Sequence, residues 1–134
     1  MALWSRRISL EWPLRLGLGL TYLYSGYSLV AHPTSWYWAV FSMPQGLQDV
    51  IGRIGIDTYL RIQGSVELFL AAVFLLWFLP RFLLRLAAFL ATLQMVGILL
   101  LVGVRGDTFR DIAILGAATA LFLSSLRPSA LRTL

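Results

Sequence analysis

The sequence has no cysteine and little charge. Without cysteine, disulfide bonds, thiolate metal sites, CxxC redox motifs and covalent attachment of haem are excluded. Only 13% of the 134 residues are charged, whereas 59% are hydrophobic and the mean hydropathy is +0.80. A soluble domain of this length cannot bury so much apolar sequence. We therefore expect a single transmembrane domain over residues 1–134, with the lipid bilayer as its solvent.

The basic residues are also restricted in kind, because all eleven are Arg and the chain has a single His. The net charge of +5 does not indicate nucleic-acid binding, since the arginines are spread between apolar segments and form no solvated patch. One His and six dispersed acidic residues offer no metal-ligand spacing, so we predict no metal site. We interpret His32 as a helix-end residue, because a second His for a two-His haem site is lacking.

Four apolar windows approach or reach the roughly 20 residues that a helix needs to cross a bilayer. They cover residues 12–31, 58–79, 82–104 and 109–126. Arginines flank the first window, the turn between the second and third, and the end of the fourth: Arg6, Arg7, Arg81, Arg85, Arg127 and Arg132. The other loops balance their charges. By the positive-inside rule, this pattern predicts an all-α four-helix membrane bundle with both termini in the cytoplasm.

The first outer loop, residues 32–57, carries two signals of contact with the membrane surface. Its aromatic cluster Trp36, Tyr37 and Trp38 is typical of side chains that anchor a loop in the headgroup layer. After Pro44, apolar side chains recur at helical spacing at Leu47, Val50, Ile51 and Ile54. This spacing predicts an amphipathic helix that lies in the interface.

Polar residues occur in the middle of all four windows. Counting about 1.5 Å per residue places Tyr22, Glu67, Gln94 and Thr119 near the bilayer midplane. A carboxylate at this depth is costly and normally faces the bundle interior, which makes Glu67 the best functional candidate. Gln63, one turn away, shares its face. These residues are our candidates for a midplane pocket, together with a residue of the first window, Arg15.

The first window also has an inward face of small and polar residues, formed by Arg15, Gly19, Tyr22 and Gly26. The long side chain of Arg15 either extends to the headgroups or reaches toward Glu67. For Glu67 itself three interpretations stay open. It belongs to a hydrogen-bonded clamp between helices, or it orients a polar head group or passes protons in a pocket, or it faces a partner subunit.

Three groups of residues resemble the DoxX family of small four-helix membrane proteins. Residues 14–26, LRLGLGLTYLYSG, are similar to the first helix of that family. Gly64-x-x-Glu67 with Arg85-Leu-Ala-Ala is similar to its second and third helices, and Arg110-Asp-Ile-Ala-Ile-Leu-Gly to its fourth. The chain departs from the family pattern at Leu29, where members commonly have Lys, and at Ala71, where they have Gly.

The resemblance implies a subunit or accessory component of a membrane-bound, quinone-linked redox complex. Some relatives are subunits of a thiosulfate:quinone oxidoreductase and others accompany oxidant-defence enzymes. Other membrane subunits are then the expected partners, and a quinone or a lipid the expected non-covalent ligand. Together with the all-Arg usage, the resemblance favours a bacterial inner (cytoplasmic) membrane. Two other functions stay open: a stand-alone binder or carrier of a small hydrophobic molecule, and a purely structural subunit.

Overall fold

The computed structural model describes residues 11–104, 106, 108 and 110–126, which form helices joined by short turns. These residues contain no strand, which confirms the predicted all-α class. The elements are α1 (Glu11–Ala31), the 3-10 helix η1 (Pro33–Trp36), α2 (Tyr37–Phe41), α3 (Gln45–Ile54), α4 (Ile56–Leu75), α5 (Arg81–Leu101) and α6 (Arg110–Leu126). Some charges used in the topology prediction lie outside the described residues: Arg6, Arg7, Arg105, Asp107, Arg127 and Arg132.

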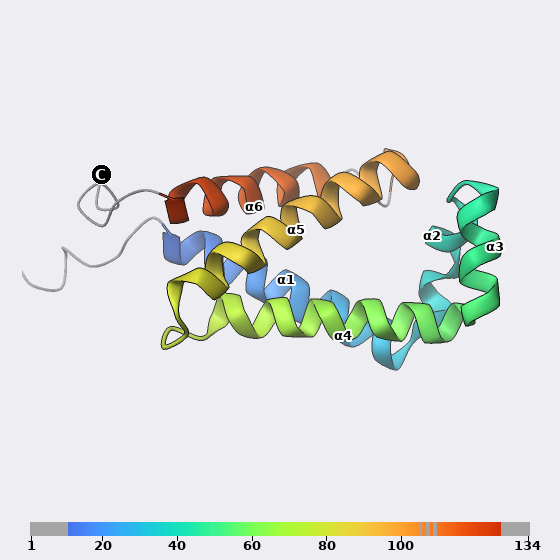
Figure 1. Ribbon diagram of the computed structural model, residues 1–134, viewed down its shortest axis with the longest axis horizontal. Coiled ribbons are helices and arrows are strands. Elements are labelled where there is room, and N and C mark those ends of the chain that lie inside the picture. Colours follow the sequence, from blue (N-terminus) through green and yellow to red (C-terminus); the bar gives the residue numbers. More distant parts are fainter. Residues whose placement is uncertain (1–10, 105, 107, 109, 127–134) are drawn as a thin grey trace, which may run out of the picture.

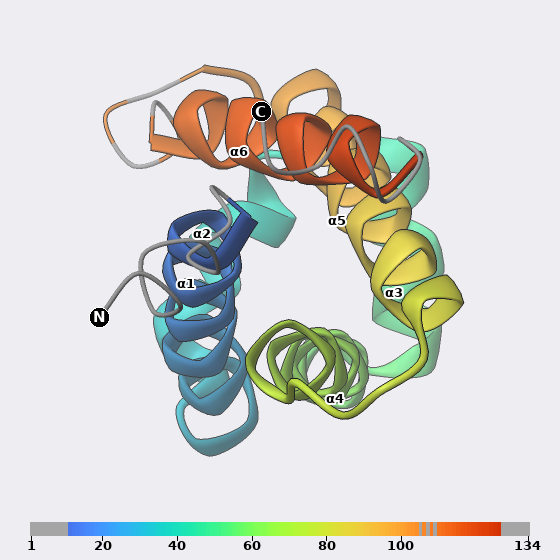
Figure 2. The same cartoon turned by 90° about the vertical axis from the view of Figure 1, so that its left-hand side faces the viewer.

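The four long helices run alternately in opposite directions around a shared interior. Figure 2 shows α1, α4, α5 and α6 at the four corners of the bundle. In Figure 1 the start of α1, the turn between α4 and α5, and the end of α6 lie on one side, which we name the turn end. The short helices α2 and α3 lie on the opposite side, which we name the loop end. α1 packs along α4, and α5 along α6.

Glycines allow α1 and α4 to approach closely. A Cβ atom added to Gly26 would lie 2.8 Å from the carbonyl oxygen of Gly64, and one added to Gly64 would lie 2.7 Å from the Cβ atom of Leu29. Small residues at a helix crossing permit close backbone contact, which is a principal source of attraction between helices in lipid. The inward face predicted for the first helix is buried at all four positions: Arg15, Gly19, Tyr22 and Gly26.

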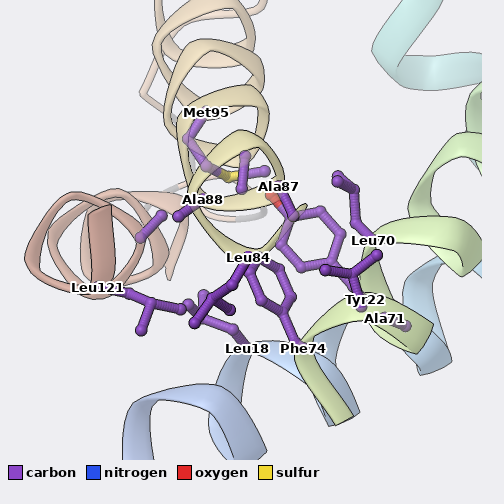
Figure 3. Close-up of a cluster of buried hydrophobic side chains, with 13 residues drawn as sticks. Leu18, Tyr22, Leu70, Ala71, Phe74, Leu84, Ala87, Ala88, Met95 and Leu121 are labelled. Atoms are coloured by element: carbon purple, nitrogen blue, oxygen red, sulfur yellow. The ribbon is translucent and has the colours of Figure 1, made fainter. Parts of the chain in front are cut away.

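The main apolar core fills the interior toward the turn end. Figure 3 shows Tyr22 of α1 and Phe74 of α4 among its side chains. The centroids of these two rings are 6.0 Å apart. Alanines of α5 and α6 pack beside them and keep these two helices close together. A second, smaller cluster lies at the loop end and consists of Leu29, Val40, Ile51 and Leu60.

The loop end contains more helix than the sequence indicated. The helix predicted after Pro44 is present as α3, with Ile51 buried and Val50 and Ile54 exposed. Before it, the predicted aromatic anchors Trp36, Tyr37 and Trp38 belong to η1 and α2. These two elements cover the interior instead of forming an open loop, because Val40 packs into the second cluster.

α4 ends at Leu75, although the apolar window continued to residue 79. Leu76 is extended, with φ −85° and ψ 124°, and Pro80 precedes α5. Arg15 determines this end, because its Nε donates to the carbonyl oxygen of Phe74 at 2.9 Å and its Nη2 to that of Leu76 at 2.7 Å. The last carbonyls of a helix need donors from outside the helix. Here the side chain of Arg15 supplies the donors that the backbone N–H groups of a further helical turn would otherwise provide.

Two described helices, α4 and α5, are long and apolar enough to cross a membrane. The outward faces of the four long helices are also largely apolar. Their exposed side chains include Leu16, Leu20, Leu23, Ile62, Val66, Phe69, Phe82, Leu86, Phe89, Leu93, Val96, Leu100 and Leu123.

Candidate functional site

Glu67 is the polar centre of the bundle interior and is only 3% exposed. Its carboxyl group accepts hydrogen bonds from the hydroxyl of Ser25 on α1 and from Nε2 of Gln94 on α5, the latter at 2.7 Å. Gln63, one turn earlier on α4, contributes a longer contact of 3.5 Å. Three helices are thus connected through one carboxyl group, and its donors are all neutral side chains.

A cavity of about 770 Å³ extends from Glu67 toward the loop end. All four long helices and the η1–α2 segment contribute to its wall. Its polar side chains include Thr21, Tyr22, Ser25, Ser28, Tyr59, Gln63, Glu67, Arg110 and Asp111. Its apolar side chains include Leu29, Trp36, Val40, Leu60, Met95, Ile98 and Val102. This volume lies within the range of small-molecule sites, which are mostly apolar and have a few directed polar groups.

Two buried polar atoms near Glu67 have no hydrogen-bond partner among the described residues. They are the hydroxyl oxygen of Tyr22 and Oε1 of Gln94. Tyr22 is 2% exposed and lines the cavity. Because buried polar atoms are nearly always paired in native proteins, the hydroxyl of Tyr22 is available to a molecule in the cavity as donor or acceptor. Gln94 does not line the cavity.

The structure brings together four of the six predicted pocket residues. Glu67, Gln63 and Tyr22 line the cavity, and Gln94 binds Glu67. Thr119 does not line the cavity. Its hydroxyl donates to the carbonyl oxygen of Leu115 in its own helix.

Arg15 lies at the turn end, away from Glu67. Its guanidinium does not reach Glu67 but binds the carbonyls that end α4 and stacks over the ring of Trp12 at 4.4 Å. Its contact with the headgroups stays a prediction. Glu11 Oε1 lies 3.7 Å from Nη1 of Arg15. The carboxylate of Glu11 also forms a bidentate ion pair with Nη1 and Nη2 of Arg81, at 3.1 and 2.7 Å. Arg15 therefore has a structural role in α4.

Two cavity residues were not anticipated from the sequence. Ser25 donates to Glu67, and its position one turn from Tyr22 on the same helix was the available signal. Asp111 also lines the cavity, and both ion pairs among the described residues involve Glu11.

The three aromatic residues of the loop end hold the η1–α2 segment in place. Nε1 of Trp36 donates to the hydroxyl oxygen of Ser28 at 2.9 Å, and the rings of Trp36 and Trp38 stack with their centroids 6.4 Å apart. The hydroxyl of Tyr37 donates to the carboxylate of Asp57, and this hydrogen bond raises the pKa of Tyr37. Their contact with lipid headgroups stays a prediction.

Within the described residues, no three His, Asp or Glu side chains are grouped so that they could hold a metal ion. Comparisons of this chain with models of protein families, with curated proteins and with solved structures found no match.

Proposed function

We propose that this chain is a four-helix integral membrane protein that binds one small amphipathic molecule in the cavity at Glu67. α1, α4, α5 and α6 are the proposed membrane spans, in the inner membrane of a bacterium, with both termini in the cytoplasm. The loop end then faces the outer side, where α3 lies in the interface. The observation that carries the ligand is the cavity with its unpartnered Tyr22 hydroxyl.

The distribution of polarity supports the membrane assignment. Apolar side chains cover the outside of the long helices, whereas Glu11, Arg15 and Glu67 are buried. In water, a protein buries its apolar side chains and exposes its charged ones. An exposed apolar area on this scale is not expected of a soluble monomer. α4 has 20 residues, which corresponds to about 30 Å and matches the hydrocarbon thickness of a bilayer.

The described charges support the orientation. Arg81 and Arg85 lie at the turn end, whereas Asp49 and Arg53 balance each other at the loop end. The absence of native cysteine makes the orientation directly testable. Single cysteines in place of Asp49 and of Phe78, an exposed residue of the α4–α5 turn, should react with a membrane-impermeant maleimide from opposite sides. Reaction from the same side would contradict this topology.

The chemistry of the cavity favours a ring that carries hydroxyl or carbonyl groups. Such a ring can form a hydrogen bond with the hydroxyl of Tyr22, which has no partner among the described residues. The apolar wall from Met95 to Val102 suits the rest of the molecule. A quinone or its quinol has this combination of groups, and so do other ring lipids.

The binding test uses purified protein in nanodiscs and a short-tailed benzoquinone as the probe. Tyr22→Phe removes one donor, and Glu67→Gln changes the group that orients Ser25 and Gln94. Loss of one hydrogen bond of about 1.4 kcal/mol weakens binding about tenfold. Ser65→Ala is the control, because Ser65 is exposed on the same helix and its hydroxyl only contacts the carbonyl oxygen of Arg61. Equal affinity of all variants, or no saturable binding, would remove the basis of this proposal.

An accessory subunit of a quinone-linked redox complex is the second candidate. It is favoured by the position of the residues that resemble the DoxX family: Glu67 and Asp111 line the cavity, and Gly64 forms the helix contact beside it. Native mass spectrometry of gently extracted protein separates the two functions. Release together with redox subunits supports the accessory subunit, whereas a monomer or homo-oligomer with a bound small molecule supports the stand-alone binder. A structural subunit predicts neither ligand nor loss of function in Glu67→Gln.

A further inference from the structure

Packed side chains of the described residues cover the cavity at both ends of the bundle. Toward the turn end, the main core blocks it, with Tyr22 packed on Phe74 at the bottom. Toward the loop end, the η1–α2 segment forms a roof, in which Val40 is 1% exposed and Trp36 is hydrogen-bonded to Ser28. The core therefore blocks access at the turn end, whereas Ser35 in the roof lines the cavity and is exposed.

Two of the four gaps between neighbouring helices are also closed. The contact of Gly26 with Gly64 seals α1 against α4, and α5 packs tightly along α6. α4 and α5 make few direct contacts, and Gln94 binds Glu67 across the gap between them. Of the residues that line the cavity on that side, Met95 and Val102 are buried, whereas Tyr59, Gln63 and Ile98 are half-buried.

The gap between α1 and α6 is different, because residues that line the cavity there also reach the surface. Thr21 and Tyr24 of α1 are exposed, and Tyr24 is 77% exposed. Ala113 and Arg110 of α6 are exposed and line the same cavity. Because these side chains line the cavity and are also exposed, the cavity reaches the surface here, on the flank of the bundle.

We infer that the α1–α6 gap is a lateral portal through which the ligand of the proposed function enters from the membrane. Thr21, Tyr24, Arg110 and Ala113 form its rim. The hydroxyl side chains of Thr21, Ser25 and Ser28 share one face of α1, and all three line the cavity. They connect the portal with Glu67, so a polar ring passing inward keeps hydrogen-bonding partners along the path.

The portal restricts the class of ligand. A polar head that reaches Glu67 and Tyr22 leaves the apolar part of the molecule at the portal, in contact with the hydrocarbon of the outer leaflet. The ligand is therefore a ring with a single flexible tail. A phospholipid with two chains does not suit a cavity of about 770 Å³, since cavities of this size hold one drug-sized molecule.

A reporter cysteine inside the cavity tests the portal without any knowledge of the ligand. Ile98 of α5 lines the cavity wall and is half-buried, and Ile98→Cys introduces the only thiol of the chain. In nanodiscs, its labelling by the lipid-soluble N-phenylmaleimide is compared with that by a trimethylammonium methanethiosulfonate, which stays in water. Lateral access predicts rapid reaction with the first reagent and slow reaction with the second.

Ala113→Trp places a bulky side chain on the rim and should slow maleimide labelling about tenfold, which corresponds to about 1.4 kcal/mol of activation free energy. Ile112→Trp is the matched control, because Ile112 is 52% exposed and does not line the cavity. Thr21→Trp, with Leu20→Trp as its control, repeats the test from α1 in case Ala113→Trp does not fold. Each variant is first checked for the size-exclusion profile and thermal transition of the parent.

Equal labelling rates in the rim and control variants, or faster reaction with the water-soluble reagent, would overturn the portal. The result does not depend on the benzoquinone titration. Slower labelling in the rim variants without probe binding contradicts only the proposed function, whereas probe binding together with equal labelling rates in the rim and control variants contradicts only the portal.

Discussion

Gly26 of α1 and Gly64 of α4 lie against each other, so that a Cβ atom on either would come within 2.8 Å of the other's carbonyl oxygen. This contact sets the distance between the two helices. It also fixes the position of Ser25 and Glu67, whose hydrogen bond crosses the same interface next to the glycines.

Gly64→Ala should therefore separate α1 from α4. We expect the free energy of unfolding to fall by about 1–3 kcal/mol, because the added Cβ clashes with the Cβ atom of Leu29 and the carbonyl oxygen of Gly26, neither of which can rotate away. The control is Gly97→Ala in α5, where an added Cβ meets nothing within 4 Å. It should stabilise the helix by about 0.5–1 kcal/mol. Unfolding by SDS in mixed micelles measures both variants, and equal effects would show that the close crossing is not important.

Glu11 and Arg81 form the second testable pair. Glu11→Gln or Arg81→Gln should each lower the free energy of unfolding by about 1–3 kcal/mol, since each leaves a charged partner without its counterpart. The double variant should lose less than the sum, with a coupling energy of about 0.5–3 kcal/mol. Arg53→Gln, at an exposed arginine of α3, controls for the change in net charge. Additive losses would contradict the pairing.

Arg15 should tolerate replacement by Lys poorly, although the charge is kept. The planar guanidinium donates from both Nε and Nη2 to carbonyls at the end of α4, and an ammonium group does not reproduce this fork. We expect a loss of about 1–3 kcal/mol. Amide exchange should become faster in the last turn of α4, as measured by hydrogen–deuterium exchange. Leu16→Ala, at an exposed neighbouring position, should leave that exchange unchanged.

Tyr37 should make the roof of the cavity sensitive to alkaline pH. Its hydrogen bond to Asp57 raises its pKa in the folded protein above the unfolded value of about 10. The stabilisation is thus fully present below about pH 10 and is lost as the pH rises through the folded-state pKa. Val40→Cys reports on the roof, because Val40 is buried there.

The readout is the rate at which iodoacetamide labels Val40→Cys with and without Tyr37→Phe. At neutral pH the thiol of Val40→Cys should react faster when Tyr37→Phe is also present, because the hydrogen bond to Asp57 is then missing. The ratio of the two rates should fall to one as the pH rises above the pKa of Tyr37. A ratio that is one at neutral pH, or that does not change with pH, would show that this hydrogen bond does not hold the roof.

Much of the local structure could be predicted from the apolar pattern. Long apolar runs and Pro44 indicated the positions of the long helices and of α3, because the pattern of neighbouring residues predicts where a helix begins and ends. The end of α4 at Leu75 could not be predicted in this way. It depends on Arg15, which is 59 residues from Phe74 in the chain.

The candidate site could likewise be predicted only in part from the sequence. By itself the sequence determined the all-α class and singled out Glu67, because a carboxyl group inside an apolar run must face inward and find donors. Only the tertiary structure decided which donors these are, since Ser25 is 42 residues and Gln94 27 residues away from Glu67. The cavity and its opening between α1 and α6 also follow from how the helices rotate and cross, which is a property of the packed bundle and not of any single segment.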